Sequence, residues 1–372
     1  ILSKNFLNYK KYFFKKVIFF ENFLNIKEKN LFSPTENSSK NKKFIITFSS
    51  GTTSQPKPII FSQNTKYYRF QHIKKTFDVK NKDVILNFST LDHSLGQRIF
   101  LLALLNGNSL IFQKKLNIYH LKKLIKKFNI SFSILPSNYL KILKKYILSN
   151  EIKIKKVVSA ASGISLDEKL SFFNSKIKFY EMYGASEIGT ITSLSKSDGI
   201  KKFKSVGKVL NGAKIKILDD NRKTLNHYKV GEISCKTNLK FENYFNNKKL
   251  TSRSFYKGYF LTGDLGYLDN KKYLYFVSRK RDLIITSGLN IYPSDIENKI
   301  SKLKNIKEVA VIGLEDEYYG EVVSAVCVLK KKSNNYETKI RVFLLKNLAT
   351  FQQPVNYFFV EKLPKNSLGK VL

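Results

Sequence analysis

The sequence has few of the residues that mark several protein classes. It contains two cysteines, one methionine and no tryptophan in 372 residues. Cys235 and Cys327 lie far apart, and the four histidines are scattered, so the short ligand spacing of a zinc site is missing. We expect both cysteines to be small core residues in a reducing compartment, which favours a cytoplasmic location.

Long apolar runs are also missing. The longest one, IFLLALL from Ile99, stops at Asn106, whereas a membrane-spanning helix needs roughly 18 to 20 apolar residues. We therefore predict no integral membrane segment. The opening KKYFFKKVIFF places aromatic residues between lysines. Such a segment suits either a helix on a membrane surface or a core helix, and we favour the core helix.

Arginine is scarce although the chain is strongly basic. Lys and Arg total 67 against 28 acidic residues, giving a net charge of +39, but only seven of the 67 are arginines. A large positive charge is typical of nucleic-acid-binding proteins. The lysines, however, are spread along the whole chain, and bidentate recognition of phosphates and bases favours arginine. We interpret the charge as a solvated lysine surface and predict no nucleic-acid partner.

Chain length and composition are those of a folded protein of about two or three domains. Hydrophobic residues make up 42% of the chain, which is enough to bury a full core. The only methionine is Met182, so we expect that translation did not begin at Ile1 and that residues have been lost from the N-terminus.

Hydrophobic periodicity predicts alternating strands and helices over residues 82–184. Residues 44–48 form a strand pattern that precedes a polar loop, and Ser165 to Glu168 has the capping-box pattern that opens a helix. The segments predicted as helices are 95–105, 118–128 and 139–147, and those predicted as strands are 82–88, 109–112, 130–136, 155–161 and 176–184. This alternation predicts an α/β fold whose sheet is partly parallel and carries helices on its faces.

The second half of the chain has a different pattern. Residues 205–277 contain short alternating strands with glycine turns. Beyond Arg279 we expect a helix from Pro293, a strand pair at 308–314 and 321–329, and a helix near 337–349. We place the domain boundary near 278–282, which divides the chain into an N-terminal domain, 1–278, and a C-terminal domain, 279–372.

A polar loop follows the first predicted strand. It reads FSSGTTSQPKP from Phe48, with hydroxyl groups, a glycine and Lys57. Backbone N–H groups, hydroxyls and a lysine in such a loop can wrap phosphate oxygens. The loop is not a Walker A motif, because no glycine precedes Lys57. By itself, a loop of this composition is more often a simple polar turn.

Four further motifs place glycines beside charged residues. YGASE from Tyr183 offers an aromatic ring for a flat base and a carboxylate, Glu187, for magnesium. YFLTGD ends at Asp264, whose carboxylate can accept two hydrogen bonds from a ribose diol. The others are the stretch SRKRDLIITSGLNIYPSDIE from Ser278 and LPKNSLGK, which ends at Lys370. Each motif taken singly is equally typical of a turn or of solvated charge.

In this order and at these intervals, the five motifs resemble the adenylate-forming superfamily, which includes acyl- and aryl-CoA synthetases, nonribosomal-peptide adenylation domains and luciferases. The resemblance runs from about residue 44 to the end. It implies a large N-terminal α/β domain and a small mobile α+β C-terminal domain. It also implies activation of a carboxylic acid by ATP as an acyl-AMP, release of pyrophosphate, and transfer of the acyl group to CoA or to the phosphopantetheine of an acyl carrier protein.

The resemblance also implies roles for individual residues. Lys370 matches the catalytic lysine of adenylation, Glu187 the Mg²⁺ ligand, Gly288 the glycine of the thiol tunnel and Arg281 the hinge. The positions that match nucleotide-binding residues of the family are Ser49, Ser50, Gly51, Thr52, Thr53, Lys57, Tyr183, Gly184, Ser186, Asp264 and Arg279. A lysine and Mg²⁺ beside the α-phosphate would offset the repulsion between two anions.

The sequence departs from the family pattern in two places. Ser54 and Pro58 replace the two glycines that usually flank the phosphate-loop lysine, which stiffens the loop. The segment before the loop is also shorter than is usual in the family, as expected of either a fragment or a compact variant. Both departures keep open a second class of function, a non-catalytic member that acts as an interaction module.

The acid is indicated by residues 90–96, which can be interpreted in two ways. His93 and Gly96 resemble a stretch of acyl- and aryl-CoA ligases, whereas Asp92 and Ser94 resemble the amino-acid adenylation domains, whose Asp pairs with the substrate amine. Gly163 ends the small-residue strand that lines the acyl groove in the family. We favour a carboxylic acid without an α-amine, such as one of fatty acid metabolism, over an amino acid loaded onto a carrier protein.

Overall fold

The computed structural model describes residues 42–49, 57–91, 93–113, 116–331, 333–365 and 371. Its largest sheet has seven strands in the order β4-β3-β5-β6-β7-β8-β9. These strands are β3 (Ile85–Asn87), β4 (Leu110–Phe112), β5 (Phe132–Pro136), β6 (Lys156–Ala160), β7 (Lys178–Ala185), β8 (Gly189–Ser195) and β9 (Lys208–Val209). The neighbours from β4 to β7 pair in parallel, and β8 and β9 pair antiparallel. The predicted partly parallel α/β sheet is confirmed.

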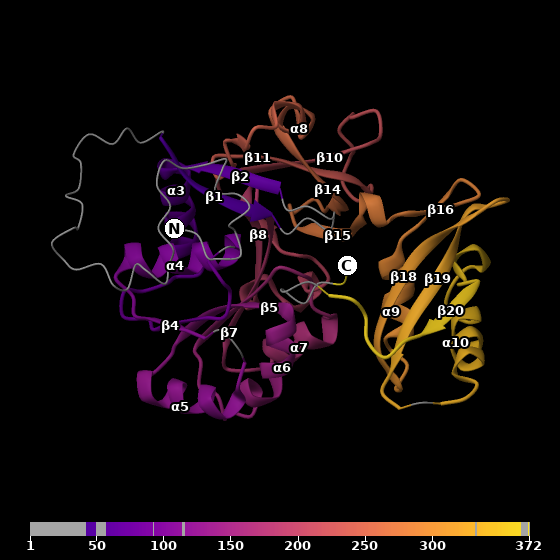
Figure 1. Cartoon of the computed structure of the whole chain (residues 1–372), viewed down its shortest axis with the longest axis horizontal. Helices are drawn as coiled ribbons and strands as arrows, with labels where there is room; N and C mark the ends of the chain where they lie inside the picture. The colour runs from indigo at the N-terminus through magenta and orange to yellow at the C-terminus, as the bar shows by residue number, and fades with distance from the viewer. Residues whose placement is uncertain are drawn as a thin grey trace. The chain divides into compact units, whose positions relative to one another are not determined.

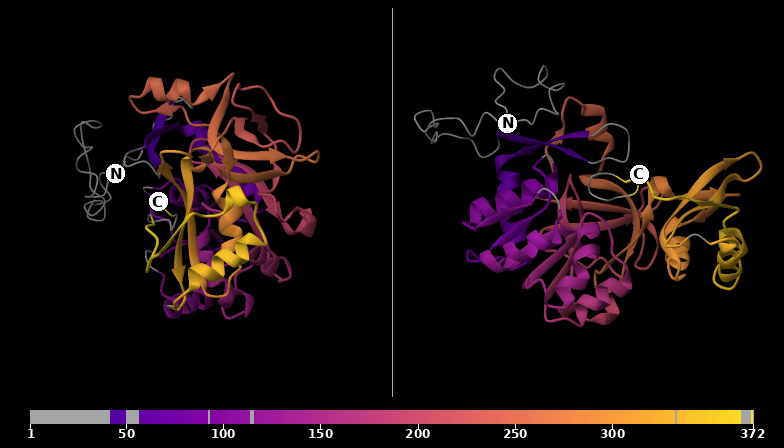
Figure 2. Two further views of the ribbon diagram at one scale, coloured as in Figure 1. Left: turned by 90° about the vertical axis from the view of Figure 1, so that its right-hand side faces the viewer. Right: turned by 60° about the horizontal axis from the view of Figure 1, so that its bottom comes forward.

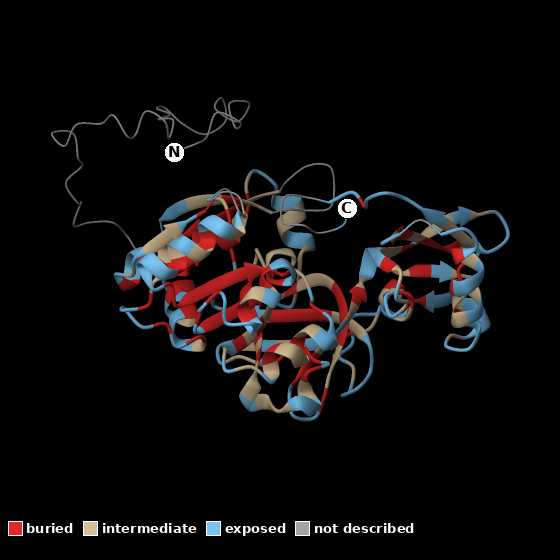
Figure 3. Cartoon of the chain, turned by 90° about the horizontal axis from the view of Figure 1, so that it is seen from below, coloured by how far each residue is buried: buried red, intermediate tan, exposed pale blue. Residues whose placement is uncertain are grey.

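Helices cover both faces of this sheet (Figure 1). Their bounds are α3 (Gln63–Thr76), α4 (Ser94–Asn106), α5 (Ile118–Phe128), α6 (Ser137–Leu148) and α7 (Leu166–Phe173). One apolar cluster joins α5, α6 and α7 to the sheet, and another joins α3 and α4 to its opposite face. The parallel strands β3, β5 and β6 are wholly buried between them, as the red strands of Figure 3 show.

Local sequence signals explain where several helices begin and end. Ser165 and Glu168 form the predicted capping box at the start of α7. The side chain of Asn117 accepts a hydrogen bond from the His120 amide at the start of α5. The helix α4 ends at Gly107, whose φ of +69° is easily adopted only by a residue without a Cβ. No helix in the described part of the chain is long and apolar enough to cross a membrane.

Two antiparallel sheets contain the remaining strands that precede residue 280. One has the order β1-β2-β12, and the other has the order β10-β11-β14-β13 with β15 paired to β14. Their strands are β1 (Lys43–Ser49), β2 (Lys57–Ser62), β10 (Ala213–Leu218), β11 (Gly231–Thr237), β12 (Asn243–Tyr244), β13 (Phe255–Tyr256), β14 (Tyr259–Leu268) and β15 (Leu274–Arg279). This confirms the short strands predicted for 205–277.

The C-terminal region has a sheet of its own (Figure 2). It also has an apolar cluster of its own. Its elements are β16 (Ile284–Thr286), β17 (Leu289–Ile291), α9 (Pro293–Ile300), β18 (Ile306–Asp316), β19 (Gly320–Leu329), α10 (Tyr336–Leu345) and β20 (Asn356–Phe359). The predicted helix at Pro293 and the predicted strand pair are confirmed. The division into domains 1–278 and 279–372, and the mobility of the second, stay predictions.

Three elements near the loop and the second sheet were not predicted from the sequence. These are β2, α3 and the short helix α8 (Lys248–Arg253). The helix α3 has the sequence QNTKYYRFQHIKKT and buries Lys66 and Arg69 together with Phe70 and Ile73. Because charged residues take inward positions of this helix, its hydrophobic periodicity is weak.

Candidate active site

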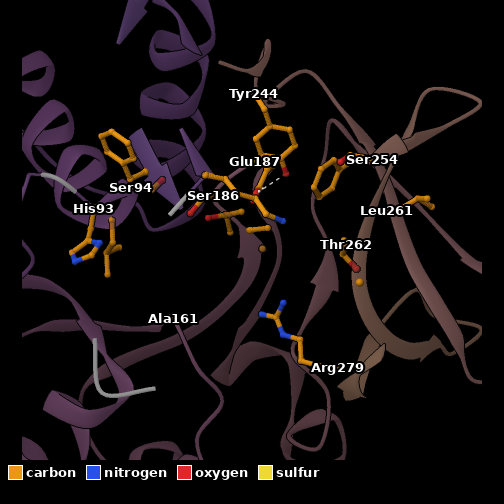
Figure 4. Close-up of a pocket in the computed structure, with 18 of the residues that line it drawn as sticks. His93, Ser94, Ala161, Ser186, Glu187, Tyr244, Ser254, Leu261, Thr262 and Arg279 are labelled. Carbon is orange, nitrogen blue, oxygen red and sulfur yellow. Dashed lines mark hydrogen bonds between the residues drawn. The ribbon is translucent and has the colours of Figure 1, made fainter. Parts of the chain in front are cut away.

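A cavity of about 710 Å³ lies where several of these elements meet, within the size range of small-molecule sites. Figure 4 shows His93 and Ser94 on one side of it, Ser186 and Glu187 in the middle, and Thr262 and Arg279 on the other side. The basic side chains that line it are Lys57, Arg98, Arg253, Arg279, Lys280 and Arg281. Only two acidic side chains, Glu187 and Glu232, line it among the described residues. This excess of positive charge suits a polyanionic ligand.

The hairpin between β7 and β8 carries the central part of the cavity wall. The register of the two strands shifts between Tyr183 and Gly184. A Cβ added at Gly184 would lie 1.9 Å from the backbone oxygen of Gly189, so only glycine fits there. The hairpin turn then presents Ser186 and Glu187 to the cavity.

A buried arginine fixes this turn. Arg69 of α3 donates from Nη1 to the Ser186 oxygen at 3.0 Å and from Nη2 to the Glu187 oxygen at 2.9 Å. Its Nε donates to the Leu239 oxygen at 2.8 Å. The guanidinium therefore satisfies three carbonyl groups at once and ties the hairpin turn to the chain that precedes β12.

The Glu187 carboxylate is held by one hydrogen bond, which the Tyr244 hydroxyl donates to Oε1 at 2.9 Å. Burial and then the charge of Glu187 raise the pKa of Tyr244, so this hydroxyl stays a donor. Among the described residues, no group of three or more His, Cys, Asp or Glu side chains could enclose a metal ion. A single carboxylate nevertheless fits Mg²⁺ that is bound mainly through nucleotide phosphates and water.

Asp264 lies at the centre of a second cluster. Its Oδ2 accepts a hydrogen bond from the Tyr183 hydroxyl at 2.6 Å, and its Oδ1 lies 2.9 Å from Nε of Arg279. Asp264 and Arg279 are directly opposite each other on β14 and β15. Burial and then the Asp264 carboxylate raise the pKa of Tyr183 well above its usual value, so the tyrosine remains protonated. The buried carboxylate is thereby kept in a fixed position beside Arg279, which lines the cavity.

The structure brings many of the predicted site residues to one place. Those that line the cavity are Lys57, His93, Gly184, Ser186, Glu187, Arg279 and Arg281. Tyr183 and Asp264 join it through Arg279. Like Tyr183 and Asp264, Gly163 and Gly288 are not among the lining residues; Gly288 lies in the turn between β16 and β17 and has a φ of +78°. The roles assigned to all these residues stay predictions.

Several predicted residues lie outside the described part of the chain. They are Ser50, Gly51, Thr52, Thr53, Asp92 and Lys370. Ser49 is described only as the last residue of β1. The phosphate-binding role of the loop, the contact of Asp92 with a substrate amine and the catalytic role of Lys370 therefore stay predictions.

Three residues of the site were missed in the sequence. Arg69 and Tyr244 support the Glu187 turn, and Arg98 of α4 lines the cavity. Neither Arg69 nor Tyr244 has a sequence signal, because each acts on residues more than fifty positions away. Arg98 had one: it is the sole charge in the apolar helix SLGQRIFLLALLN.

Known proteins share both the sequence and the fold. The family described as AMP-binding enzyme matches residues 12–245, and the AMP-binding enzyme C-terminal domain matches residues 295–370. The chain belongs to the AMP-binding enzyme family. The predicted resemblance to adenylate-forming enzymes is thus confirmed.

Among the relatives, the 2-succinylbenzoate–CoA ligase of Listeria monocytogenes is 30% identical over 328 residues, covering 88% of this chain and 68% of the relative. The o-succinylbenzoate CoA synthetase of Bacillus subtilis, solved with an acyl-adenylate, has a TM-score of 0.82 at 25% identity, covering 90% of this chain and 68% of that one. ATP-bound MatB of Rhodopseudomonas palustris has a TM-score of 0.83 at 26% identity, covering 91% and 68%. The chain thus spans about two thirds of each.

The predicted reaction class is confirmed by these relatives, which are AMP-forming ligases. The protein is an acid–thiol ligase: it activates a carboxylic acid with ATP as an acyl-AMP and then forms a thioester. The predicted co-substrates ATP and CoA and the predicted Mg²⁺ are confirmed in the same way, since a further Bacillus subtilis structure of the synthetase contains ATP and magnesium.

Proposed function

We propose that this ligase activates a carboxylic acid without an α-amine, of the fatty or aryl class, and transfers it to CoA. The observation that carries the proposal is the pair of clusters on one cavity, Glu187 with Tyr244 and Asp264 with Arg279. The CoA ligases among the relatives support CoA as acceptor. An acyl carrier protein stays a prediction, as does the cytoplasmic location.

We infer that the Asp264 cluster binds the nucleotide. Its carboxylate lies beside Arg279 and can accept hydrogen bonds from the two ribose hydroxyls. The Tyr183 hydroxyl already donates a hydrogen bond to Oδ2 of this carboxylate. This bond limits the positions that a ribose can take. We infer that this cluster sets the position of the nucleotide and hence that of its α-phosphate.

We infer that the Glu187 turn acts on the phosphates. When Mg²⁺ is bound, Glu187 would be its protein ligand, and the ion would supply charge stabilisation of the phosphate oxygens. Lys57 and Arg279 line the same cavity and would reduce the repulsion between an incoming carboxylate and the phosphates. Because Arg69 fixes the turn through backbone oxygens, little reorganisation is needed when the ligand binds.

Lys370 is our proposed catalytic group for adenylation. A lysine at the attacking oxygen would stabilise the charge that develops in the first step only. Lys370→Ala should therefore slow acyl-AMP formation by about 10²- to 10³-fold, with little change in the conversion of supplied acyl-AMP to thioester. An equal loss in both half-reactions would refute this division of roles.

ATP–pyrophosphate exchange with a panel of acids tests the proposal. We expect exchange only when an acid is present, with AMP and pyrophosphate as products and fatty or aryl acids as substrates. Exchange restricted to α-amino acids would instead support the adenylation-domain alternative. Absence of exchange with every acid would support the non-catalytic alternative, for which the Ser54 and Pro58 departures are the motivating observation.

A further inference from the structure

Three buried polar side chains meet where β1, α3 and α4 pack against one another (Figure 1). Thr47 of β1 donates from Oγ1 to Oε1 of Gln97 on α4 at 2.6 Å. Nζ of Lys66 on α3 donates to the same Gln97 oxygen at 3.0 Å and lies 3.5 Å from Oγ1 of Thr47. All three residues are buried. The cluster therefore connects the three elements through directional polar contacts.

Lys66 is the unusual member of this cluster. Its ammonium lies 4.1 Å from the centre of the Phe61 ring, and no carboxylate of the described chain forms an ion pair with it. Burial, and then the charges of Arg69 and Arg98, lower the pKa of Lys66 well below its usual value. Enclosing an ammonium without a counter-charge is unfavourable. An apolar side chain at this inward position of α3 would avoid that cost.

The other buried lysines provide a comparison. Among the described residues, only Lys156 and Lys169 are buried as Lys66 is. Nζ of Lys156 lies 2.7 Å from Oδ2 of Asp83, and Nζ of Lys169 lies 2.5 Å from Oε2 of Glu181. Each of these two ammonium groups has its counter-charge within the fold. Lys66 has instead an amide oxygen and a hydroxyl, and groups kept at such a cost are often found beside functional sites.

The cluster is next to the cavity wall on two elements. Thr47 precedes Phe48 on β1, and the Gln97 amide donates to the His93 oxygen at 3.1 Å. Phe48 and His93 form a parallel β-bridge with each other, and both line the cavity. The strand β1 and the start of α4 are thus joined twice, by this bridge at the cavity and by the Thr47–Gln97 hydrogen bond beside it.

The two joined elements serve different substrates in the proposed function. The phosphate-loop motif follows β1 in the sequence, whereas α4 begins beside the residues predicted to contact the acid. Buried hydrogen bonds weaken when their partners shift, whereas apolar contacts tolerate small shifts. We propose that Thr47, Lys66 and Gln97 are positioning residues that couple β1 to α4, so that ATP and the acid each strengthen the binding of the other. None of the three lines the cavity, so they act through Phe48 and His93. This inference rests on the proposed function.

Titration calorimetry of the whole chain measures this coupling. The nucleotide probe is the Mg²⁺ complex of α,β-methylene-ATP, whose α–β bridge cannot be cleaved. The acid is the one with the highest kcat/KM in pyrophosphate exchange, from a panel that includes octanoate and benzoate. The Kd of the acid is measured with and without the nucleotide analogue. Wild type should bind the acid about 5- to 150-fold more tightly when the analogue is bound, and the acid should strengthen binding of the analogue by the same factor.

The decisive variant, Thr47→Val/Lys66→Met/Gln97→Leu, replaces all three polar groups by apolar groups of similar size. Because no member of the cluster is left without its partner, the urea midpoint should stay at or above that of wild type. The ratio of the two Kd values of the acid should nevertheless fall close to unity. A cluster with a merely structural role would instead leave the wild-type ratio in a variant that is as stable as wild type.

Two further variants separate coupling from stability. Gln97→Glu keeps an oxygen acceptor and gives Lys66 a counter-charge, so the wild-type ratio should be retained. Lys156→Met is the matched control, because Lys156 is buried to a similar extent but neither belongs to the cluster nor lines the cavity. It should lower the urea midpoint, since Asp83 loses its cation, and keep the wild-type ratio.

Two results would overturn the inference and leave the proposed function standing. One is equal Kd values of the acid with and without the analogue in wild type, and the other is a wild-type ratio in the triple variant. Pyrophosphate exchange would persist in either case, because the reaction itself does not require the coupling. Absence of exchange with every acid would overturn both the inference and the proposed function.

A second measurement does not depend on the folding of a variant. Hydrogen exchange of wild type, followed by mass spectrometry, reports on residues 43–47 of β1 and 99–106 of α4, which do not line the cavity. The nucleotide analogue alone should slow exchange in the α4 peptide several-fold, and the acid alone should slow exchange in the β1 peptide. Protection that each ligand confines to its own element would contradict the coupling.

Discussion

The region before residue 280 and the C-terminal region are stabilised differently. All eight buried charged residues of the described chain belong to the first region: Lys66, Arg69, Asp83, Lys156, Lys169, Glu181, Asp264 and Asp269. In the second, the only buried polar residue among those described is Ser324, and the core cluster is formed by aliphatic residues, Cys327 and Tyr336.

This difference indicates where the fold requires side chains in fixed positions. Arg69 and Asp264 have several defined partners each, and both support groups at the cavity. Buried charges constrain geometry because a displaced charge loses its partners in a medium of low dielectric. A purely apolar core, such as that of the C-terminal region, tolerates small shifts more readily. Four sets of variants test this contrast, in order of decreasing effect.

The largest effect should come from the buried pair in which Lys169 Nζ lies 2.5 Å from Glu181 Oε2. Lys169→Met leaves a buried carboxylate without its cation, and we expect the free energy of unfolding to fall by about 3 to 5 kcal/mol. Urea denaturation measures this change. The double variant Lys169→Met/Glu181→Leu should recover most of the lost stability. A double variant as unstable as the single one would contradict the unpaired Glu181 carboxylate as the cause of the loss.

The same pair predicts a pH dependence. Burial raises the pKa of Glu181, so the folded state holds this proton at pH values where the unfolded state has released it. Stability therefore falls as pH rises from the unfolded pKa through the folded one. Removal of Lys169 raises the folded pKa further, so the deficit of Lys169→Met should be larger at pH 8 than at pH 5. A deficit independent of pH would count against a charged Glu181 as its cause.

Arg69→Lys should give the next largest effect. An ammonium cannot reach three carbonyl oxygens in the fork geometry, so buried acceptors lose their donors, at about 1 to 3 kcal/mol in total. Because the Ser186–Glu187 turn is then held less firmly, KM for Mg-ATP in pyrophosphate exchange should also rise. Arg222→Lys on the surface is the control. Loss of stability with an unchanged KM would show that the turn does not need this support.

A third prediction concerns apolar packing. The loss of a buried methylene group should lower stability by a similar amount in the two regions. Ile134 of the large sheet and Ile300 of α9 are both fully buried. Ile→Val at either position should lower stability by about 0.5 to 1.5 kcal/mol. Urea denaturation of both variants measures this change in the free energy of unfolding. A much larger cost at Ile300 would show that the C-terminal core is the more constrained one.

The smallest effect is expected for an exposed ion pair of the C-terminal region. Arg341 Nε lies 2.8 Å from Glu337 Oε1, and the two side chains are 43% and 44% exposed. Arg341 also donates to the Pro354 and Val355 oxygens, so Glu337→Gln is the variant that weakens the ion pair alone. Solvent screens such a pair, and Glu337→Gln should therefore lower the free energy of unfolding by no more than about 1 kcal/mol. The difference from wild type should shrink in 1 M salt. A cost that matches that of Lys169→Met would remove the contrast between the regions.

Local signals in the sequence determined most of the secondary structure. The helix predicted at 118–128 has those bounds in the structure, and the Ser165 capping box opens α7 as expected. Both depend on residues within one or two turns of each other. The helix α3 was missed because its inward positions include Lys66 and Arg69, which contradict the apolar pattern that marks a buried helix face.

The sequence by itself also determined the family, since ordered motifs with glycines and charged residues identify backbone geometry and ligand chemistry. Only the tertiary structure decided which groups act together. Arg69 meets Ser186 and Glu187, and Tyr244 meets Glu187, across long stretches of chain. Such contacts depend on strand order and helix placement, which result from burying whole faces of many elements at once. No local pattern records that arrangement.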